Sequence, residues 1–205
     1  MEAGSYRLFS AESRGSPRLR WAESDNADPW SFSRYTFYAD LIVLGQRDRS
    51  DPMDHLLPAD FLPTVLMQSG RPALVLPYAG SFGPIGKRVL IAWNESRESA
   101  RAVSAALPWL RTASSVHIVA YGDEAQQALD RLQMFLRAHG VADLRLHAGS
   151  RDDDVGNQLL SMAADTGADL LVMGCYGHSR AREWVLGGAT RTILATMTLP
   201  VLMSH

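Results

Sequence analysis

The sequence predicts an α/β fold with an open, doubly wound parallel sheet and helices on both faces of the sheet. From Arg88 to the C-terminus, short apolar runs alternate with stretches whose apolar residues recur at helical spacing, which is typical of βαβ units. Glycines follow two of the helical stretches, where a left-handed C-terminal residue is favoured. Of the 205 residues, 46% are hydrophobic and 20% are charged, so the chain can build a core of ordinary globular type.

Five apolar runs are expected to form the strands of this sheet. They lie at 88–93, 115–121, 143–148, 168–174 and 199–203. Because crossovers between parallel strands are right-handed, few topologies remain. We expect the strand order 3-2-1-4-5, in which the loops after residues 93 and 174 face each other. Doubly wound sheets bind ligands at this switch point, beyond the carboxyl ends of the strands.

Four helices are expected to connect these strands. The first begins after Ser96 as N-cap, and Pro108 is expected to kink or shorten its end. Its apolar face consists of Val103, Ala106, Leu107 and Leu110. The second covers about 123–139 and ends before Gly140.

The third expected helix starts in the acidic run 152–154 and ends at Gly167, and the fourth begins near Gly187. Three consecutive carboxylates could be interpreted as a magnesium or general-base cluster. Stabilisation of a helix N-terminus by negative charge explains them equally well.

Residues 1–84 are expected to be a partial, degenerate repeat of the complete unit at 85–205. The run ADLIVLG at 39–45 returns as ADLLVMG at 168–174, and a segment from Thr64 to Pro72 returns between Thr192 and Pro200. Two matched blocks that differ by one residue in their offset indicate an internal repeat.

The first two strands of the unit have no counterpart in this N-terminal half. Residues 18–23 are interpreted as its third strand and 29–38 as a weak helix, with 77–87 as a Gly- and Pro-rich linker. We do not expect this half to fold alone. It is either a tandem repeat that begins midway or an appendage that completes itself on a second chain.

Charge and cysteine content disfavour several classes of function. The formal net charge is −2, without a basic stripe, which disfavours nucleic acid and anionic membrane surfaces as partners. Lys87 is the only lysine, so no phosphate-binding loop of the G-x-x-x-x-G-K-[ST] type can be written. The single cysteine, Cys175, favours a cytoplasmic location. The six histidines lack metal-ligand spacing, so we expect no metal bound by the protein alone.

A glycine-rich segment after the fourth expected strand carries the strongest functional signal. Gly174 and Gly177 are followed by nine residues and then by Gly187, Gly188, Ala189 and Thr190, which open the last helix. Glycines let the backbone approach a polyanion closely, and the N–H groups of a helix start attract phosphate. Thr190 adds a hydroxyl donor. A tight turn followed by a closely packed glycine is the alternative interpretation.

This segment resembles the universal stress protein family, whose nucleotide-binding members have G-x2-G-x9-G-[ST] after the fourth strand of a 3-2-1-4-5 sheet. The resemblance covers 88–205 in full and about 18–77 as a partial repeat. It implies a stress-response protein, often dimeric, whose members either bind ATP or have lost the site. The nucleotide-binding residues that it implies here are Ala92, Trp93, Asn94, Tyr121, Met173, Gly174, Gly177, Gly187, Gly188, Ala189 and Thr190.

Three departures from the family pattern bear on this site. Asn94 stands where ATP-binding members usually have Asp, and Gly188 replaces a Ser or Thr. Trp93 could stack on adenine or fill the space where adenine should lie. In the N-terminal half, Asp48 stands in place of Gly177, and Ala59, Asp60 and Leu62 stand in place of Gly187, Gly188 and Thr190. That half has lost the phosphate loop, which leaves at most one nucleotide site per chain.

We therefore expect an ATP-binding regulatory module, with Mg²⁺ on the phosphates. At most it is a slow ATPase, because no catalytic nucleophile or base can be identified. The alternative is a nucleotide-free stress protein that dimerises and acts through protein–protein interaction. The edge strand 199–203 would then pair with a second copy, or with 72–77 of the same chain. Arg180, Arg182 and His178 in the spacer, and Cys175, are interpreted mainly as surface or packing residues.

Overall fold

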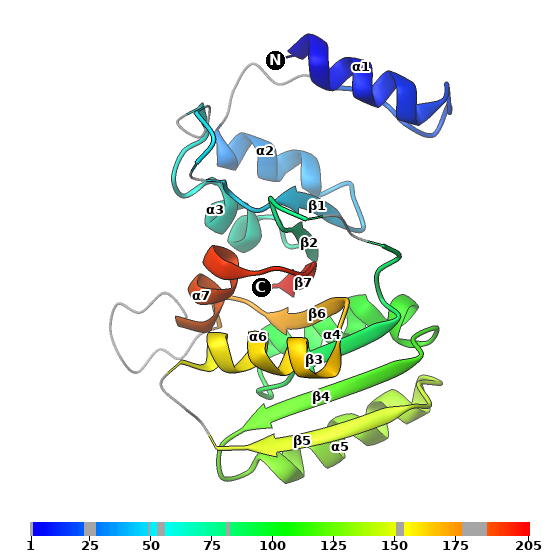
Figure 1. The fold of residues 1–205 in the computed structure, drawn as a ribbon, viewed down its shortest axis with the longest axis vertical. Coiled ribbons are helices and arrows are strands. Elements are labelled where there is room, and N and C mark those ends of the chain that lie inside the picture. The colour runs from blue at the N-terminus through cyan, green and yellow to red at the C-terminus, as the bar shows by residue number, and fades with distance from the viewer. Residues whose placement is uncertain are drawn as a thin grey trace.

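A computed structural model of the chain shows an α/β fold with one mixed sheet of seven strands (Figure 1). It describes residues 2–22, 28–48, 50–52, 56–80, 83–150, 154–177 and 188–205. The strands are β1 (Ile42–Gly45), β2 (Ala73–Leu76), β3 (Arg88–Ala92), β4 (Ser115–Tyr121), β5 (Leu144–Gly149), β6 (Leu170–Gly174) and β7 (Val201–Ser204). The described helices are α1 (Glu2–Ser13), α2 (Pro29–Thr36), α3 (Phe61–Gln68), α4 (Arg97–Leu110), α5 (Ala125–Ala138), α6 (Val155–Thr166) and α7 (Gly188–Thr196).

The sheet is larger than the expected one and is not wholly parallel. Its order is β1-β2-β7-β6-β3-β4-β5, so the five strands that begin at Arg88 lie side by side as β5-β4-β3-β6-β7. The expected five-stranded parallel sheet is wrong in its extent, because β2 pairs antiparallel with β7 and β1 pairs parallel with β2. The open edge of β7 is thus extended by the N-terminal strands.

Helices cover the two faces of the sheet unequally. Helices α4 and α5 pack on one face over the C-terminal strands, around Val103, Leu110 and Leu129. Helices α6 and α7 pack on the other face with α3, around Leu159, Ile193 and Val65. Figure 1 shows α2 and α3 beside β1 and β2, and α1 away from the sheet. Among the described helices, none has the length and apolar character needed to cross a membrane.

The C-terminal helices begin and end for the local reasons that the sequence indicates. At α4, the Ser96 hydroxyl accepts from the Ser99 N–H, and the Ser99 hydroxyl accepts from the Ser96 N–H, each at 3.1 Å, which forms a capping box. Pro108, which was expected to kink or shorten the end of this helix, lies within α4, which ends at Leu110. Helix α6 ends at Gly167, which has a left-handed φ of 60° that favours glycine.

The N-terminal segments match the expected partial repeat only in part. Residues 18–22 form no strand, contrary to expectation, and the chain instead begins with α1. Helix α2 lies within the expected 29–38, with Asp28 accepting from the Ser31 N–H at 2.8 Å and Pro29 at its first position. Residue 23, the last residue of the strand expected at 18–23, lies outside the described residues.

Strand pairing in the two halves follows one register. Ile42 lies opposite Ala73 in the β1–β2 pair, and Leu171 lies opposite Val201 in the β6–β7 pair. These positions correspond at the offsets of 129 and 128 residues that relate the two sequence blocks. The shared register supports the hypothesis of an internal repeat, which stays a prediction.

A local two-fold relation connects the two strand pairs. In the β2–β7 ladder, Leu74 lies opposite Leu202, with Ala73 opposite Met203 and Val75 opposite Val201. Equivalent residues of the two halves therefore exchange places about the Leu74–Leu202 pair, as in a symmetric dimer interface. The strand at 199–203 was expected to pair either with a second copy or with residues 72–77 of the same chain. The structure shows pairing within the chain, between β2 and β7.

The linker between the halves is held by one side chain. The carboxylate of Asp169 accepts hydrogen bonds from the backbone N–H groups of Gly86, Lys87 and Arg88, at 2.6, 2.9 and 3.0 Å. Gly86 has a φ of +84°, and a Cβ there would stand 2.6 Å from the Trp109 ring. Asp169 thereby holds the start of β3 next to the start of β6, and Gly86 lets it lie against Trp109 of α4.

Two histidines meet on the face of β4 and β5. The Nδ1 of His117 lies 3.0 Å from the Nε2 of His147, with nearly parallel rings, so one imidazole donates to the lone pair of the other. His117 is buried. Burial, the neighbouring His147 and the charge of Arg145 lower the pKa of His117, and Asp143 opposes them. The folded chain therefore favours neutral His117.

Acidification should destabilise the fold through this pair. Because the pKa of His117 is lower in the folded chain, the unfolded chain binds more protons, and stability falls as the pH drops below about 6.5. The expected loss is about 1.4 kcal/mol for each unit by which the pKa is lowered. Urea unfolding at pH 7.5 and 5.5 measures it. The dependence should be shallower in His117→Leu and unchanged in His139→Gln; equal slopes in all three proteins would contradict the assignment.

Candidate functional site

The structure brings several of the sequence-predicted site residues to the carboxyl ends of the two central strands. Ala92 lies opposite Met173 in the β3–β6 pair, and Gly174 follows directly. Tyr121 ends the neighbouring strand β4, and its side chain packs against the same apolar cluster as Met173. These residues meet at the switch point, where β3 leads into α4 and the chain after β6 runs toward α7.

The first glycine of the loop is in close contact with the start of α4. A Cβ at Gly174 would stand 2.5 Å from the Ser99 backbone nitrogen and 2.8 Å from the Glu98 carbonyl carbon, so any side chain there would collide with backbone. Tyr176 has a φ of 52°, a left-handed conformation. Left-handed residues occur in turns whose successive N–H groups converge on one side and bind anions. Because Gly174 has no side chain, the loop can lie close to the start of α4.

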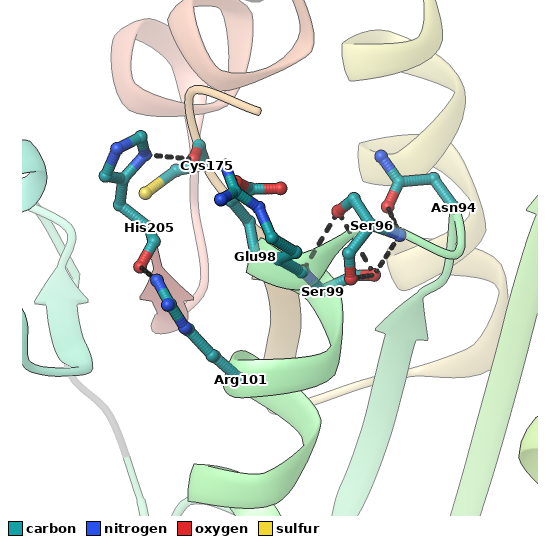
Figure 2. Close-up of polar contacts among 8 residues, drawn as sticks. Asn94, Ser96, Glu98, Ser99, Arg101, Cys175 and His205 are labelled. Atoms are coloured by element: carbon teal, nitrogen blue, oxygen red, sulfur yellow. Dashed lines mark hydrogen bonds and ion pairs between the residues drawn. The ribbon is translucent and has the colours of Figure 1, made fainter. Parts of the chain in front are cut away.

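A buried carboxylate lies beneath the second glycine, and sequence reasoning missed it. Glu98, in the first turn of α4, is 3% exposed, and its Oε2 is 3.2 Å from the position of a Gly177 Cβ. Figure 2 shows it between Cys175 and the Ser96–Ser99 capping pair. Its Oε1 accepts from the Arg97 guanidinium at 3.3 Å. An acidic residue in a first helical turn usually caps the helix, so the pattern gave no signal of this burial.

The environment of Glu98 keeps its carboxylate charged. Burial alone would raise the pKa of Glu98. Hydrogen bonds from its own backbone N–H and from Ser96, with the charges of Arg97 and His205, outweigh burial and leave the pKa below its ordinary value. A negative charge is thus fixed beneath the glycine loop at neutral pH.

The three side chains that follow β3 have different surroundings. Trp93 packs against the cluster under α4 and α5, on the sheet face opposite Ala92 and Met173, and its buried Nε1 meets no acceptor among the described residues. Asn94 is exposed, and its Oδ1 accepts from the Ser96 N–H at 3.3 Å. Glu95, with a φ of 53°, accepts two hydrogen bonds from Arg131, at 2.8 and 2.9 Å, which tie the segment to α5.

The helix end of the expected loop is described only from Gly188. Gly188 opens α7 and has open space around its Cβ position, Ala189 is half-buried, and Thr190 is 3% exposed. Gly187 lies outside the described residues, as do Arg180, Arg182 and His178 of the spacer and the first two residues of the acidic run 152–154. The third, Asp154, caps α6 by accepting from the Asn157 N–H at 3.1 Å.

Cys175 and Tyr176, which lie between Gly174 and Gly177, are not ionised at neutral pH. Burial, reinforced by the charge of Glu98, raises the pKa of the Cys175 thiol to about 12. Burial also raises the pKa of Tyr176 to about 12. The ring Nδ1 of His205 lies 3.2 Å from the Cys175 carbonyl, and Arg101 donates to the His205 carbonyl at 2.8 Å (Figure 2). Within the described ranges, no three His, Cys, Asp or Glu side chains gather as a metal site.

Comparison with known proteins identifies the architecture. The model of the universal stress protein family matches residues 86–205, more than half of the chain. The chain belongs to the universal stress protein family. The matched residues include β3 to β7 and all four glycines of the loop.

Universal stress proteins from other organisms resemble most of the chain. A curated universal stress protein of Synechocystis sp. is 28% identical over 166 residues, which are 80% of this chain and 57% of the relative. The chain thus spans little more than half of that relative's length. A universal stress protein from Archaeoglobus fulgidus has a similar fold, with a TM-score of 0.73 and 18% identity over 98% of this chain and 75% of that one. A protein from Pseudomonas aeruginosa PAO1 gives a TM-score of 0.58, 19% identity and 98% and 77% coverage.

A side chain at Gly174 should disrupt the contact between the loop and α4. We expect Gly174→Ala to lower the free energy of unfolding by about 1–3 kcal/mol, because its Cβ would overlap the Ser99 nitrogen. Gly188→Ala is the matched control from the same loop, since its Cβ would meet open space. Chemical unfolding of both variants measures the difference. Equal stabilities would show that the approach of α4 to Gly174 is not close.

Proposed function

We propose that this universal stress protein binds ATP, as a regulatory ligand, at the carboxyl ends of β3 and β6. The observation that carries the proposal is the meeting of Ala92, Met173 and Gly174 at the switch point, beside a loop that needs glycine for steric reasons. The nucleotide-contacting residues would be those that the family resemblance implies, from Ala92, Asn94 and Tyr121 to the two glycine pairs and Thr190. The Trp93 side chain would take no part, because it packs on the opposite face of the sheet.

Each end of this site has a physical rationale. Tyr121 and Met173 supply apolar surface for a base, and backbone N–H groups of the glycine loop and of the α7 start supply donors for phosphates. Mg²⁺ would accompany the phosphates, because its preferred ligands are oxygens and it is usually held by phosphates with one or two carboxylates. The fixed charge of Glu98 strengthens the need for a cation at this end.

The site suits a binding role better than rapid catalysis. The thiol of Cys175 and the phenol of Tyr176 are protonated at neutral pH, since the pKa of each is raised to about 12. Neither group can therefore act as a base toward an attacking water. Binding would act as a signal, with hydrolysis slow at most. Residues 85–205 would form the nucleotide-binding unit, and residues 1–84 would be a degenerate repeat of it. The single cysteine cannot form a disulfide within the chain, which favours a cytoplasmic location.

Calorimetric titration of the nucleotide-stripped chain with Mg-ATP tests the proposal. We expect about one site per chain with a micromolar dissociation constant, an affinity of about 8 kcal/mol. Gly177→Asp should abolish binding, because it adds a second carboxylate next to Glu98 and the phosphates. Gly177→Asn, which has the same size without the charge, should weaken binding less. Absence of binding by the unsubstituted chain would overturn the proposal.

A second candidate is the nucleotide-free protein that acts through protein contacts. The buried, charged Glu98 beneath Gly177 favours it, because this charge repels phosphate. A partner copy would have to use a surface other than β7, since β2 occupies that edge.

Sedimentation velocity tests whether the full chain forms a dimer or remains a monomer in which β2 covers β7. The full chain should remain monomeric at micromolar concentration if β2 completes the edge of β7. A chain that begins at Gly86 exposes this edge and should self-associate. It should bind added full-length protein only weakly, because β2 already covers the edge of β7 there. A full-length dimer that persists without ATP, together with failure of the titration above, would favour the second candidate.

A further inference from the structure

The register of β4 and β5 places two histidines side by side. Val119 lies opposite His147 in this parallel ladder, and His117, two residues before Val119, shares its face of the sheet. The residues between them along the strands, Ile118 and Leu146, pack in the cluster on the other face. The paired backbones therefore hold the imidazoles of His117 and His147 as diagonal neighbours.

The face that carries these histidines is open to solvent along β5. Strand β5 is the last of the sheet, and Figure 1 shows α5 on one side of β4 and β5, with α6 on the other side over β3. His147 is half-buried. Beside it, the side chains of Asp143 and Arg145 are 49% and 58% exposed and form an ion pair at 3.6 Å. A small ion can thus reach the histidines from this side.

The two ring nitrogens are spaced like two ligands of one metal ion. Nδ1 of His117 lies 3.0 Å from Nε2 of His147. Imidazole nitrogens lie about 2.0–2.1 Å from bound zinc, so two of them are about 2.9 Å apart at right angles and about 3.4 Å apart in a tetrahedron. The strands are therefore already at the right separation. The rings need only turn until both lone pairs face the ion, and the outer torsion of histidine is broad.

The protonation state of the pair suits a metal ligand. Burial, with the charges of His147 and Arg145, lowers the pKa of His117, which favours the neutral imidazole that binds metals. Without metal, one of the two facing nitrogens carries the proton of the hydrogen bond between the rings. When a metal binds, this proton moves to the other nitrogen of its own ring, so the charge of the pair does not change.

We propose that His117 and His147 form a chelating pair for a divalent transition-metal ion that prefers imidazole, with Zn²⁺ as its representative and water as the remaining ligands. Oxygen-preferring ions such as Mg²⁺ do not suit the pair. Catalytic zinc sites usually have three protein ligands, so binding here is reversible and weaker than in such sites. The spacing of histidines in the sequence predicted no metal, because these two are 30 residues apart and meet only through the sheet.

Titration of the metal-stripped full chain with Zn²⁺, followed by NMR of the histidine side chains, tests the proposal. We expect one Zn²⁺ per chain, with the largest nitrogen shifts at Nδ1 of His117 and Nε2 of His147. Excess Mg²⁺ should not displace it. Absence of binding, or shifts confined to other histidines, would overturn the proposal.

A single-ligand variant with a matched control assigns the site. His147→Gln removes one ligand and keeps a side chain that can hydrogen-bond to His117. It should weaken Zn²⁺ binding at least about tenfold, because loss of a group that only orients a metal ligand already costs about 10–100-fold. His139→Gln, at the end of α5, should leave the affinity unchanged.

Thermal unfolding gives a second readout of the same variants. Zn²⁺ should raise the unfolding midpoint of the unsubstituted chain and of His139→Gln, because it binds the folded form, and should raise that of His147→Gln much less. Unaltered Zn²⁺ affinity in His147→Gln would overturn the proposal even if a variant of the buried His117 does not fold. The pair shares no residue with the proposed nucleotide site, and Mg-ATP titration of the same samples reports on that site, so either proposal can fail alone.

Discussion

The antiparallel pairing of β2 with β7 is the interaction on which the architecture of this chain depends. Strands β1 and β2 have four residues each, and two short strands are marginal in water on their own. Pairing with β7 places Ala73 and Val75 in a core that also contains Val201 and Met203, all fully buried. The N-terminal half is therefore stable as an extension of the C-terminal sheet, and the edge of β7 is covered without a second chain.

The same pairing fixes the relative direction of the strands in the two halves. Because β2 runs antiparallel to β7, and β1 and β6 run parallel to their partners, the carboxyl ends of β1 and β6 point in opposite directions. A cavity beside Gln46, at the carboxyl end of β1, and the glycine loop after β6 therefore lie at opposite ends of the sheet strands. Gln46 nevertheless contacts the Leu194 carbonyl in α7, so the halves share a buried hydrogen bond besides the ladder.

Carboxylates have different consequences in the two halves. In the C-terminal half, Glu98 is buried under the loop and stays charged through hydrogen bonds at the α4 start, while Asp169 is used to hold the linker. In the N-terminal half, Asp48 lines a cavity, and the N–H and hydroxyl of Ser50 donate to its carboxylate. A fixed negative charge near phosphate must be offset by a cation. Glu98 and Asp48 thus place a carboxylate near the carboxyl end of a strand in each half.

Local patterns in the sequence determined the α/β class, the five strands from β3 to β7 and the helix ends at Ser96, Gly140 and Gly167, because period and capping depend only on neighbouring residues. They also predicted that Ala92, Met173 and Gly174 meet, since parallel strands end at one edge. The seven-stranded extent of the sheet, the burial of Glu98 and the His117–His147 contact were decided only in the tertiary structure. Each depends on which edges and faces come together, and such contacts between residues far apart in the chain leave no periodic signal in the sequence.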